Sequence, residues 1–256
     1  MNSIAAPVAR PPTDQVRQPD GLTATDSRDA QAGLLGRVVP NSRSHWALLI
    51  LVLAGGIAFN LTWFIDGLLR PGYDPLVQPM SALSLGPGGW VQITNFAVFG
   101  AIGCLSAFAW RATLSPGLGA TWYPRLAIIA GLAMIGAAIF SQDPGMGFPV
   151  GVPALAHPSV HAQIHNAVSY IALMTTIAGL LILARRLHRE PSWRGWAPAA
   201  LTTGVLMMVF LAVFGILTAQ HGPGGIFEKL ASLTPSLLGI ALAGRLFLQR
   251  DARISC

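Results

Sequence analysis

Charged residues are scarce in this sequence, and their scarcity limits the kinds of protein that it can encode. Only 10% of the 256 residues are charged, whereas 53% are hydrophobic. Soluble domains carry about 25% charged residues. Water is therefore not the main solvent of this chain, and a soluble globular domain is not expected.

Cysteine is also rare, and the motifs that mark common enzyme sites are missing. Of the two cysteines, Cys104 lies inside an apolar run and Cys256 is the last residue. We do not expect these side chains to meet, so no disulfide is predicted. The sequence has no G-x-S-x-G, no phosphate-binding loop and no dinucleotide fingerprint. No motif therefore assigns a reaction.

The first part of the chain has little apolar content. Residues 1–44 are rich in Pro, Asp, Gln, Thr and Arg. Such a segment cannot offset the entropy cost of ordering by burying apolar surface. It also lacks the basic and then apolar pattern of a secretory signal peptide. The composition predicts a disordered N-terminal tail over residues 1–44.

Six long apolar runs follow the tail. A membrane-spanning helix needs about 20 mostly apolar residues, and in hydrocarbon its backbone polar groups must pair within the segment. The sequence therefore predicts an all-α membrane protein, a six-transmembrane-helix bundle over residues 45–250, with a short C-terminal end at residues 251–256. The predicted spans are residues 46–69, 90–110, 122–141, 159–184, 196–219 and 226–248.

The basic residues predict how this bundle is oriented. Arg and Lys total 16, and only Arg70 and Lys229 fall on one side of the predicted bundle. The others lie in the tail, between the second and third spans, between the fourth and fifth, and at the C-terminal end. Arg and Lys favour the cytoplasmic side, so we predict a multi-pass plasma-membrane protein with both termini cytoplasmic. Basic residues that flank apolar runs fit contact with anionic lipid headgroups and argue against nucleic-acid binding, which needs a clustered basic face.

Polar residues within the spans concentrate in the half opposite the basic side. The fourth span carries His161 and His165, which are four residues apart and share a helix face. Ionisable residues in spans are costly and usually face the bundle interior or a wet cavity. We therefore predict an outward-facing polar cavity, lined by the first, second, fourth and sixth spans and covered by the two longer loops. The candidate binding residues are Asp74, Ser81, Asn95, Asp143, His161, His165, His221 and Glu228.

Simpler structural roles are open for several of these residues. Asp66 and Arg70 are four apart with the acid first, which suits an ion pair on a helix surface. Glu228 suits the start of the sixth span, where the helix dipole favours an acid. Lys229 can extend its ammonium group to the headgroups.

The two histidines of the fourth span allow two interpretations. They can hydrogen-bond within the bundle, as polar residues between membrane helices do. Alternatively, His at i and i+4 can both reach one zinc ion, with His221 or Asp143 as a third ligand and water in an open position. Ala162 follows His161, so the glutamate of the H-E-x-x-H motif is absent.

These alternatives lead to different classes of function. The first is a protein that binds or senses a small molecule or a lipid headgroup without catalysis. The second is a metal-dependent membrane hydrolase, in which Asp74 or Glu228 acts as the general base. A transporter is a further alternative, although Pro235 is the only sign of a broken helix. No pattern in the sequence assigns an oligomeric state.

The loop after the first span resembles a known family. Its sequence, GYDPLVQPMSALSLGP, an Asp-Pro after the third span and a His at the head of the fourth are similar to the bacterial and archaeal membrane family catalogued as domain of unknown function 998. The resemblance covers residues 46–250 and implies a six-span bundle without an assigned activity. The residues that carry it are Asp74, Pro75, Ser81, Leu83, Asp143, Pro144, His161 and His165.

Overall fold

The computed structural model describes residues 43–254, with side chains as far as Leu248. This part of the chain is helical, and its elements are joined by loops and turns. The long helices are α2 (Arg43–Leu69), α3 (Trp90–Leu114), α4 (Trp122–Ile139), α5 (Val160–Arg189), α6 (Ala197–Ala219) and α7 (Gly225–Ile254), and the short 3-10 helices are η1 (Met80–Ser84) and η2 (Arg194–Trp196).

The predicted fold class is confirmed. Within the described residues, six helices are long and apolar enough to cross a membrane, and each corresponds to one predicted span. The largest differences are at the helix ends that carry basic residues. Helix α2 begins at Arg43, and α7 continues to Ile254, into the predicted C-terminal end. The rest of the predicted tail, residues 1–42, lies outside the described residues.

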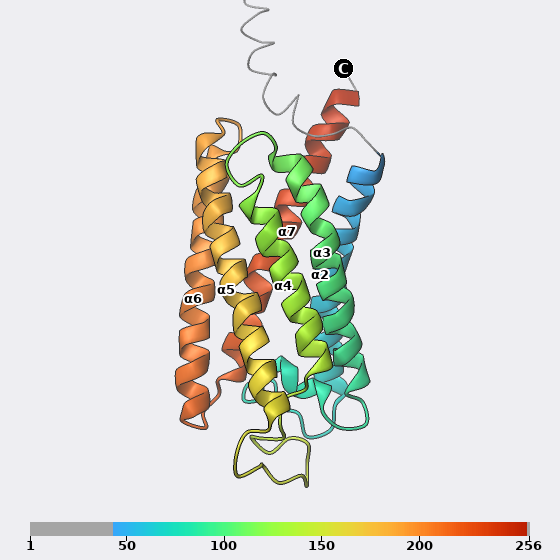
Figure 1. Cartoon of the computed structure of the whole chain (residues 1–256), viewed down its shortest axis with the longest axis vertical. Coiled ribbons are helices and arrows are strands. Elements are labelled where there is room, and N and C mark those ends of the chain that lie inside the picture. Colours follow the sequence, from blue (N-terminus) through green and yellow to red (C-terminus); the bar gives the residue numbers. More distant parts are fainter. Residues whose placement is uncertain (1–42, 255–256) are drawn as a thin grey trace, which may run out of the picture. The chain divides into compact units, whose positions relative to one another are not determined.

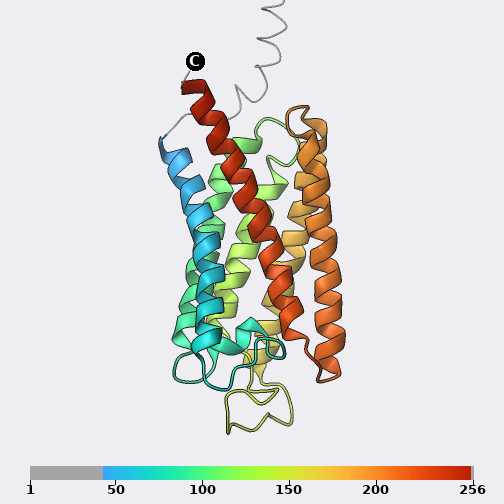
Figure 2. The ribbon, with the colours of Figure 1, turned by 180° about the vertical axis from the view of Figure 1, so that it is seen from behind.

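The six long helices form a ring in chain order. Each long helix contacts the next one along the chain, and α7 also contacts α2, which closes the ring. The helices run side by side in alternating directions (Figure 1). Seen from behind, α7 crosses obliquely between α2 and α6 (Figure 2). Contacts between α2 and α7 are sparser than those between any other neighbouring pair in the ring.

Small residues allow a close approach between α3 and α4. A Cβ atom added to Gly100 would lie 2.5 Å from the carbonyl oxygen of Gly131, and a Cβ on Gly131 would lie 2.5 Å from that of Gly100. The two backbones therefore touch where larger side chains would separate them, as is common between membrane helices.

Helix α7 remains one helix through Pro235. Proline has no N–H, so the carbonyl of Ala231 loses its usual helical donor. The hydroxyl of Thr234 donates to this carbonyl over 3.4 Å. This arrangement does not supply the pair of half-helices that the transporter alternative would favour.

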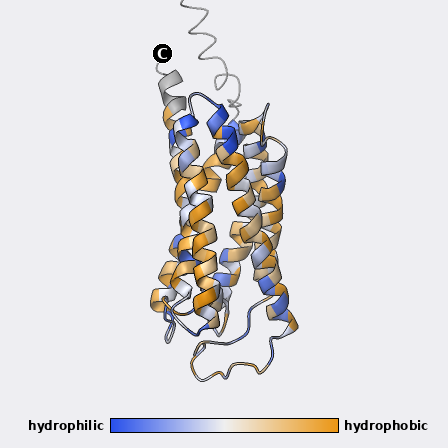
Figure 3. Ribbon diagram, turned by 90° about the vertical axis from the view of Figure 1, so that its left-hand side faces the viewer, coloured by the Kyte–Doolittle hydropathy of each residue, from blue (hydrophilic) through white to orange (hydrophobic). Residues whose placement is uncertain are grey.

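The alternating directions place three connections at one end of the ring. We call this the loop end; it contains residues 70–89, 140–159 and 220–224. The start of α2, the other two connections and the end of α7 lie at the opposite end, which we call the terminal end (Figure 1). Figure 3 shows apolar residues along the length of the helices and most hydrophilic residues toward the two ends.

Candidate functional site

Two loops pack together over the loop end. We call residues 70–89 and 140–159 the cover. The side-chain amide of Gln78 donates to the carbonyl of Met146 over 2.8 Å, and the hydroxyl of Ser81 donates to the side-chain oxygen of Gln142 over 2.7 Å. The cover is therefore tied together by hydrogen bonds.

Apolar contacts hold the cover to the helices. The ring of Tyr73 packs edge-on against Phe148, with 5.6 Å between centroids. Leu83, in η1, is fully buried in the same cluster as Phe59 of α2 and Phe96 of α3. The cover therefore contributes several buried side chains to the bundle's core.

Lys229 of α7 joins the cover to the ring. Its ammonium group donates to the carbonyls of Gln78 over 2.7 Å, Pro75 over 2.9 Å and Gly225 over 3.2 Å. It also lies 5.3 Å from the centroid of the Tyr73 ring. Only 3% of Lys229 is exposed. The prediction that this lysine reaches the headgroups is wrong, because three carbonyl dipoles and an aromatic face stabilise its charge inside.

Glu228 reinforces the same junction. It lies in the first turn of α7, as predicted, and its carboxylate accepts a hydrogen bond from the backbone N–H of Met80 over 2.5 Å. The hydroxyl of Tyr73 donates to the carbonyls of Gln78 and Pro79. Burial, and then the negative charge of Glu228, raise the pKa of the Tyr73 hydroxyl. The phenol therefore stays protonated and remains a donor.

Asp143 stabilises the start of α5. Its carboxylate accepts hydrogen bonds from the backbone N–H of Ser159 over 2.7 Å and from the Ser159 hydroxyl over 2.6 Å. The same hydroxyl accepts from the backbone N–H of Ala162 and so caps the helix. An acid at a helix N-terminus is favourable. The Ser159 cap was missed from sequence, although a serine just before an apolar run is a known helix-start signal.

The two histidines of α5 have different surroundings. His165 is 2% exposed, and its Nδ1 lies 2.6 Å from the carbonyl oxygen of Phe140. His161 is exposed and packs edge-on against the Phe140 ring, with 5.4 Å between centroids. His221 is exposed in the turn after α6, and its backbone has a positive φ of 56°.

These positions do not assemble the predicted zinc ligands. Among the side chains of residues 43–248, no group of three or more His, Cys, Asp or Glu is arranged to hold a metal ion. The Asp143 carboxylate is hydrogen-bonded to Ser159, and Nδ1 of His165 is hydrogen-bonded to the carbonyl of Phe140. Helical spacing places His161 and His165 on neighbouring turns of α5, but the helix bundle buries only His165.

The remaining candidates also have local partners. The predicted ion pair is confirmed, because Arg70 lies 2.8 Å from Asp66; Arg70 also donates to two carbonyls of the cover. Asp74 is exposed and accepts from the backbone N–H of Leu76. Asn95 of α3 donates to the carbonyl of Phe59 in α2 over 3.1 Å. These side chains hold loops and helix ends in place.

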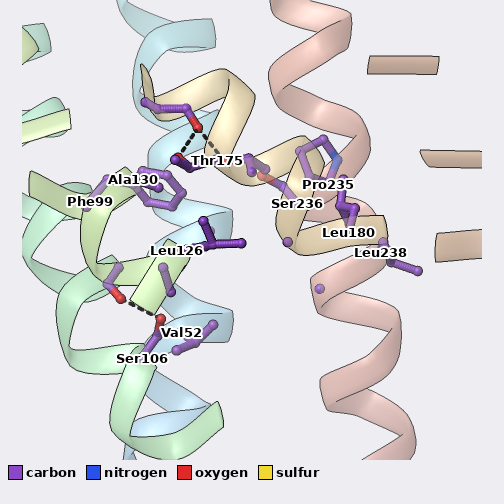
Figure 4. Close-up of a pocket in the computed structure, with 18 of the residues that line it drawn as sticks. Val52, Phe99, Ser106, Leu126, Ala130, Thr175, Leu180, Pro235, Ser236 and Leu238 are labelled. Carbon is purple, nitrogen blue, oxygen red and sulfur yellow. Dashed lines mark hydrogen bonds between the residues drawn. The ribbon is translucent and has the colours of Figure 1, made fainter. Parts of the chain in front are cut away.

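A cavity of about 270 Å³ lies inside the ring, away from these residues. Residues from all six long helices line it, and Gly56, Thr175 and Met207 each lie near the middle of their helix. Its wall is mainly apolar, and the described residues that line it carry no charge. Figure 4 shows this wall. We predicted an outward-facing polar cavity, whereas this cavity is mainly apolar and central.

Glycines create part of this space. A Cβ atom added to Gly56 or Gly239 would meet nothing within 4 Å. Both residues line the cavity. Small residues in membrane helices are usually explained by close helix packing. From the sequence alone, a buried glycine that borders empty space looks the same as one that packs against a neighbouring helix.

Comparison with known proteins identifies a family. Residues 52–245 match the family model described as "Protein of unknown function (DUF998)". This match covers more than half of the chain and confirms the resemblance carried by the first loop. No curated protein and no solved structure matched the chain.

Proposed function

We propose that this protein, which belongs to the DUF998 family, binds an apolar molecule drawn from the bilayer inside its ring of six helices. The observation that carries the proposal is the central cavity of about 270 Å³ with an uncharged, mainly apolar wall. Ligand pockets are typically apolar, with a few polar groups that fix orientation. Burial of an apolar chain in such a wall contributes about 25 cal/mol per Å².

The hydrogen-bonded cover favours a route by which the ligand enters from the membrane. Hydrogen bonds from Lys229, Gln78 and Ser81 tie the cover to α7 and to itself at the loop end. The sparse contacts between α2 and α7 leave a weaker seam that faces the lipid. A lipid-derived molecule reaches the cavity through this seam without crossing the cover.

The distribution of charge supports the proposed orientation, with the terminal end on the cytoplasmic side of the plasma membrane. At the loop end, the two described cations are both shielded: Lys229 is buried, and the Arg70 side chain is 11% exposed and paired with Asp66. Exposed cations gather at the terminal end, where they can contact anionic headgroups. They are Arg43, Arg111, Arg125, Arg185, Arg189 and Arg194.

A substitution that fills the cavity tests the proposal. Gly56→Leu places a side chain into open space at mid-cavity. Gly215→Leu is the matched control, because Gly215 is also inside a helix with nothing within 4 Å of an added Cβ, but it is exposed and does not line the cavity. Leucine is a better helix former than glycine at both positions, so neither change should break its helix.

Native mass spectrometry of the purified proteins gives the readout. We expect the parent and Gly215→Leu to retain a co-purified small molecule, and Gly56→Leu to lose about nine-tenths of it, a change of about 1.4 kcal/mol in binding. Equal retention by all three proteins, or no bound molecule on the parent, would contradict the proposal.

A further inference from the structure

We infer that the bound molecule is neutral and places a hydrogen-bond donor, such as the hydroxyl of a long-chain alcohol, between α5 and α7 at mid-cavity. This inference rests on the proposed function, because it names the chemical class of ligand for the same cavity. It follows from the charge of the wall and from the way its hydroxyl groups are already used.

The lack of charge in the wall argues against an anionic ligand. The described residues that line the cavity include no Lys, Arg, His, Asp or Glu. A carboxylate or phosphate buried there would lose its hydration without gaining an opposite charge, which is strongly unfavourable. A neutral polar group avoids that cost.

The cavity wall includes two threonines of α5, Thr175 and Thr176, whose hydroxyl hydrogens are already donated to backbone carbonyls. Thr176 donates to the carbonyl of Ala172 over 2.8 Å. Thr175 donates to the carbonyls of Ile171 over 2.7 Å and Ala172 over 3.1 Å. A hydroxyl whose hydrogen is used still has lone pairs that accept. Both threonines therefore offer acceptors to a ligand.

Helix α7 contributes acceptors to the same zone. The hydroxyl of Ser236 donates to the carbonyl of Ser232 over 3.2 Å. Pro235 also lines the cavity and removes one backbone donor from this turn. Figure 4 shows Thr175, Pro235 and Ser236 toward one end of the wall and Ser106 toward the other.

Ser232, one turn before Ser236, also lines the cavity, and the remaining polar wall residues lie nearer the terminal end. Ser106 donates to the carbonyl of Gly103 over 2.6 Å, so it too presents an acceptor. Tyr123, beside Trp110 near the start of α4, contributes a phenol there. The zone between α5 and α7 is therefore rich in acceptors, and a ligand hydroxyl is the neutral group that complements it.

Three probes with one chain separate charge from hydrogen-bond donation. Oleyl alcohol is neutral and has a donor, its methyl ether is neutral without a donor, and oleate is charged. Their affinities are measured for the full-length protein in detergent by the shift of its melting temperature with probe concentration. We expect the alcohol to bind about tenfold more tightly than the ether and at least about a hundredfold more tightly than oleate.

Isosteric variants locate the acceptors. The double variant Thr175→Val/Thr176→Val removes two hydroxyls while keeping volume nearly constant, and Ser236→Ala removes the one on α7. Each should reduce the preference for alcohol over ether to about threefold or less. Thr203→Val is the control, because Thr203 makes the same bond to a carbonyl four residues earlier but does not line the cavity. It should keep the full preference.

The outcomes separate this inference from the proposed function. Equal affinity for alcohol and ether, or tighter binding of oleate, overturns the inference while cavity binding stands. An unchanged preference in both the Thr175/Thr176 and Ser236 variants also overturns it. If no probe binds and Gly56→Leu retains the same co-purified molecule as the parent, the proposed function itself fails.

Discussion

The ammonium nitrogen of Lys229 lies 2.7 Å from the carbonyl oxygen of Gln78, and this bond joins residues 151 positions apart in the chain. It connects the last long helix to the loop that follows the first. With its two other carbonyl partners, the bond makes the cover a continuation of the bundle. The only lysine of the sequence thus serves the fold at the loop end.

Loss of this charge should loosen the cover. Lys229→Met keeps much of the apolar stem but leaves three carbonyls without their shared donor. We expect a loss of about 2–4 kcal/mol in the free energy of unfolding, measured as a lower melting temperature in detergent. Arg185→Met removes an exposed cation and should have little effect. Equal melting of the two variants would show that the buried ammonium is not structural.

The cap of α5 should behave as one unit. Asp143→Ala and Ser159→Ala should each cost about 1–2 kcal/mol, because each removes part of the same chain of hydrogen bonds. The double variant should lose less than the sum of the two, with a coupling of at least about 0.5 kcal/mol in a double-mutant cycle of thermal unfolding. Simple additivity would contradict the geometry.

The histidines should differ in their effect on stability. His165→Ala removes a buried ring and its contact with the Phe140 carbonyl, so we expect a loss of about 2–4 kcal/mol. His161→Ala affects an exposed side chain and should change the melting temperature little. If the His161 variant is the less stable one, the surroundings of the two rings have been assigned the wrong way round.

The proposed orientation has a separate test. A periplasm-active phosphatase fused after Gly151, in the cover, should be active, and one fused after Arg253 should be silent. An active fusion at Arg253 would reverse the orientation. The cavity proposal does not depend on this result, because it concerns the middle of the bundle.

Sequence reasoning identified the spans because length and apolarity alone determine them. It also identified the Asp66–Arg70 pair, since helical spacing places the two residues together. It failed where the partner is a distant backbone group. Two of the three carbonyls around Lys229, those of Pro75 and Gln78, come from a loop whose path depends on packing against α7, and no spacing rule encodes that path. The prediction that Lys229 extends its ammonium group to the headgroups took account of its place at the helix end but not of this loop.

The central cavity was not predicted from the sequence for a related reason. Polar residues in the half predicted to face outward suggested a wet site, but Glu228, Asn95 and His165 each satisfy a backbone group instead. The central cavity is bounded partly by glycines such as Gly56, whose open side becomes visible only when all six helices are placed.

Site-specific photocrosslinking in native membranes tests the central claim most directly. A diazirine amino acid close to methionine in size would replace Met134, which lines the cavity, or Met174, which is 49% exposed on α5 and does not line it. After irradiation, the mass of each crosslinked peptide reports the molecule at that position. We expect Met134 to yield one defined small-molecule adduct and Met174 the mixed phospholipids of the bilayer. No adduct at Met134, or the same phospholipid mixture at both positions, would contradict a ligand-binding cavity.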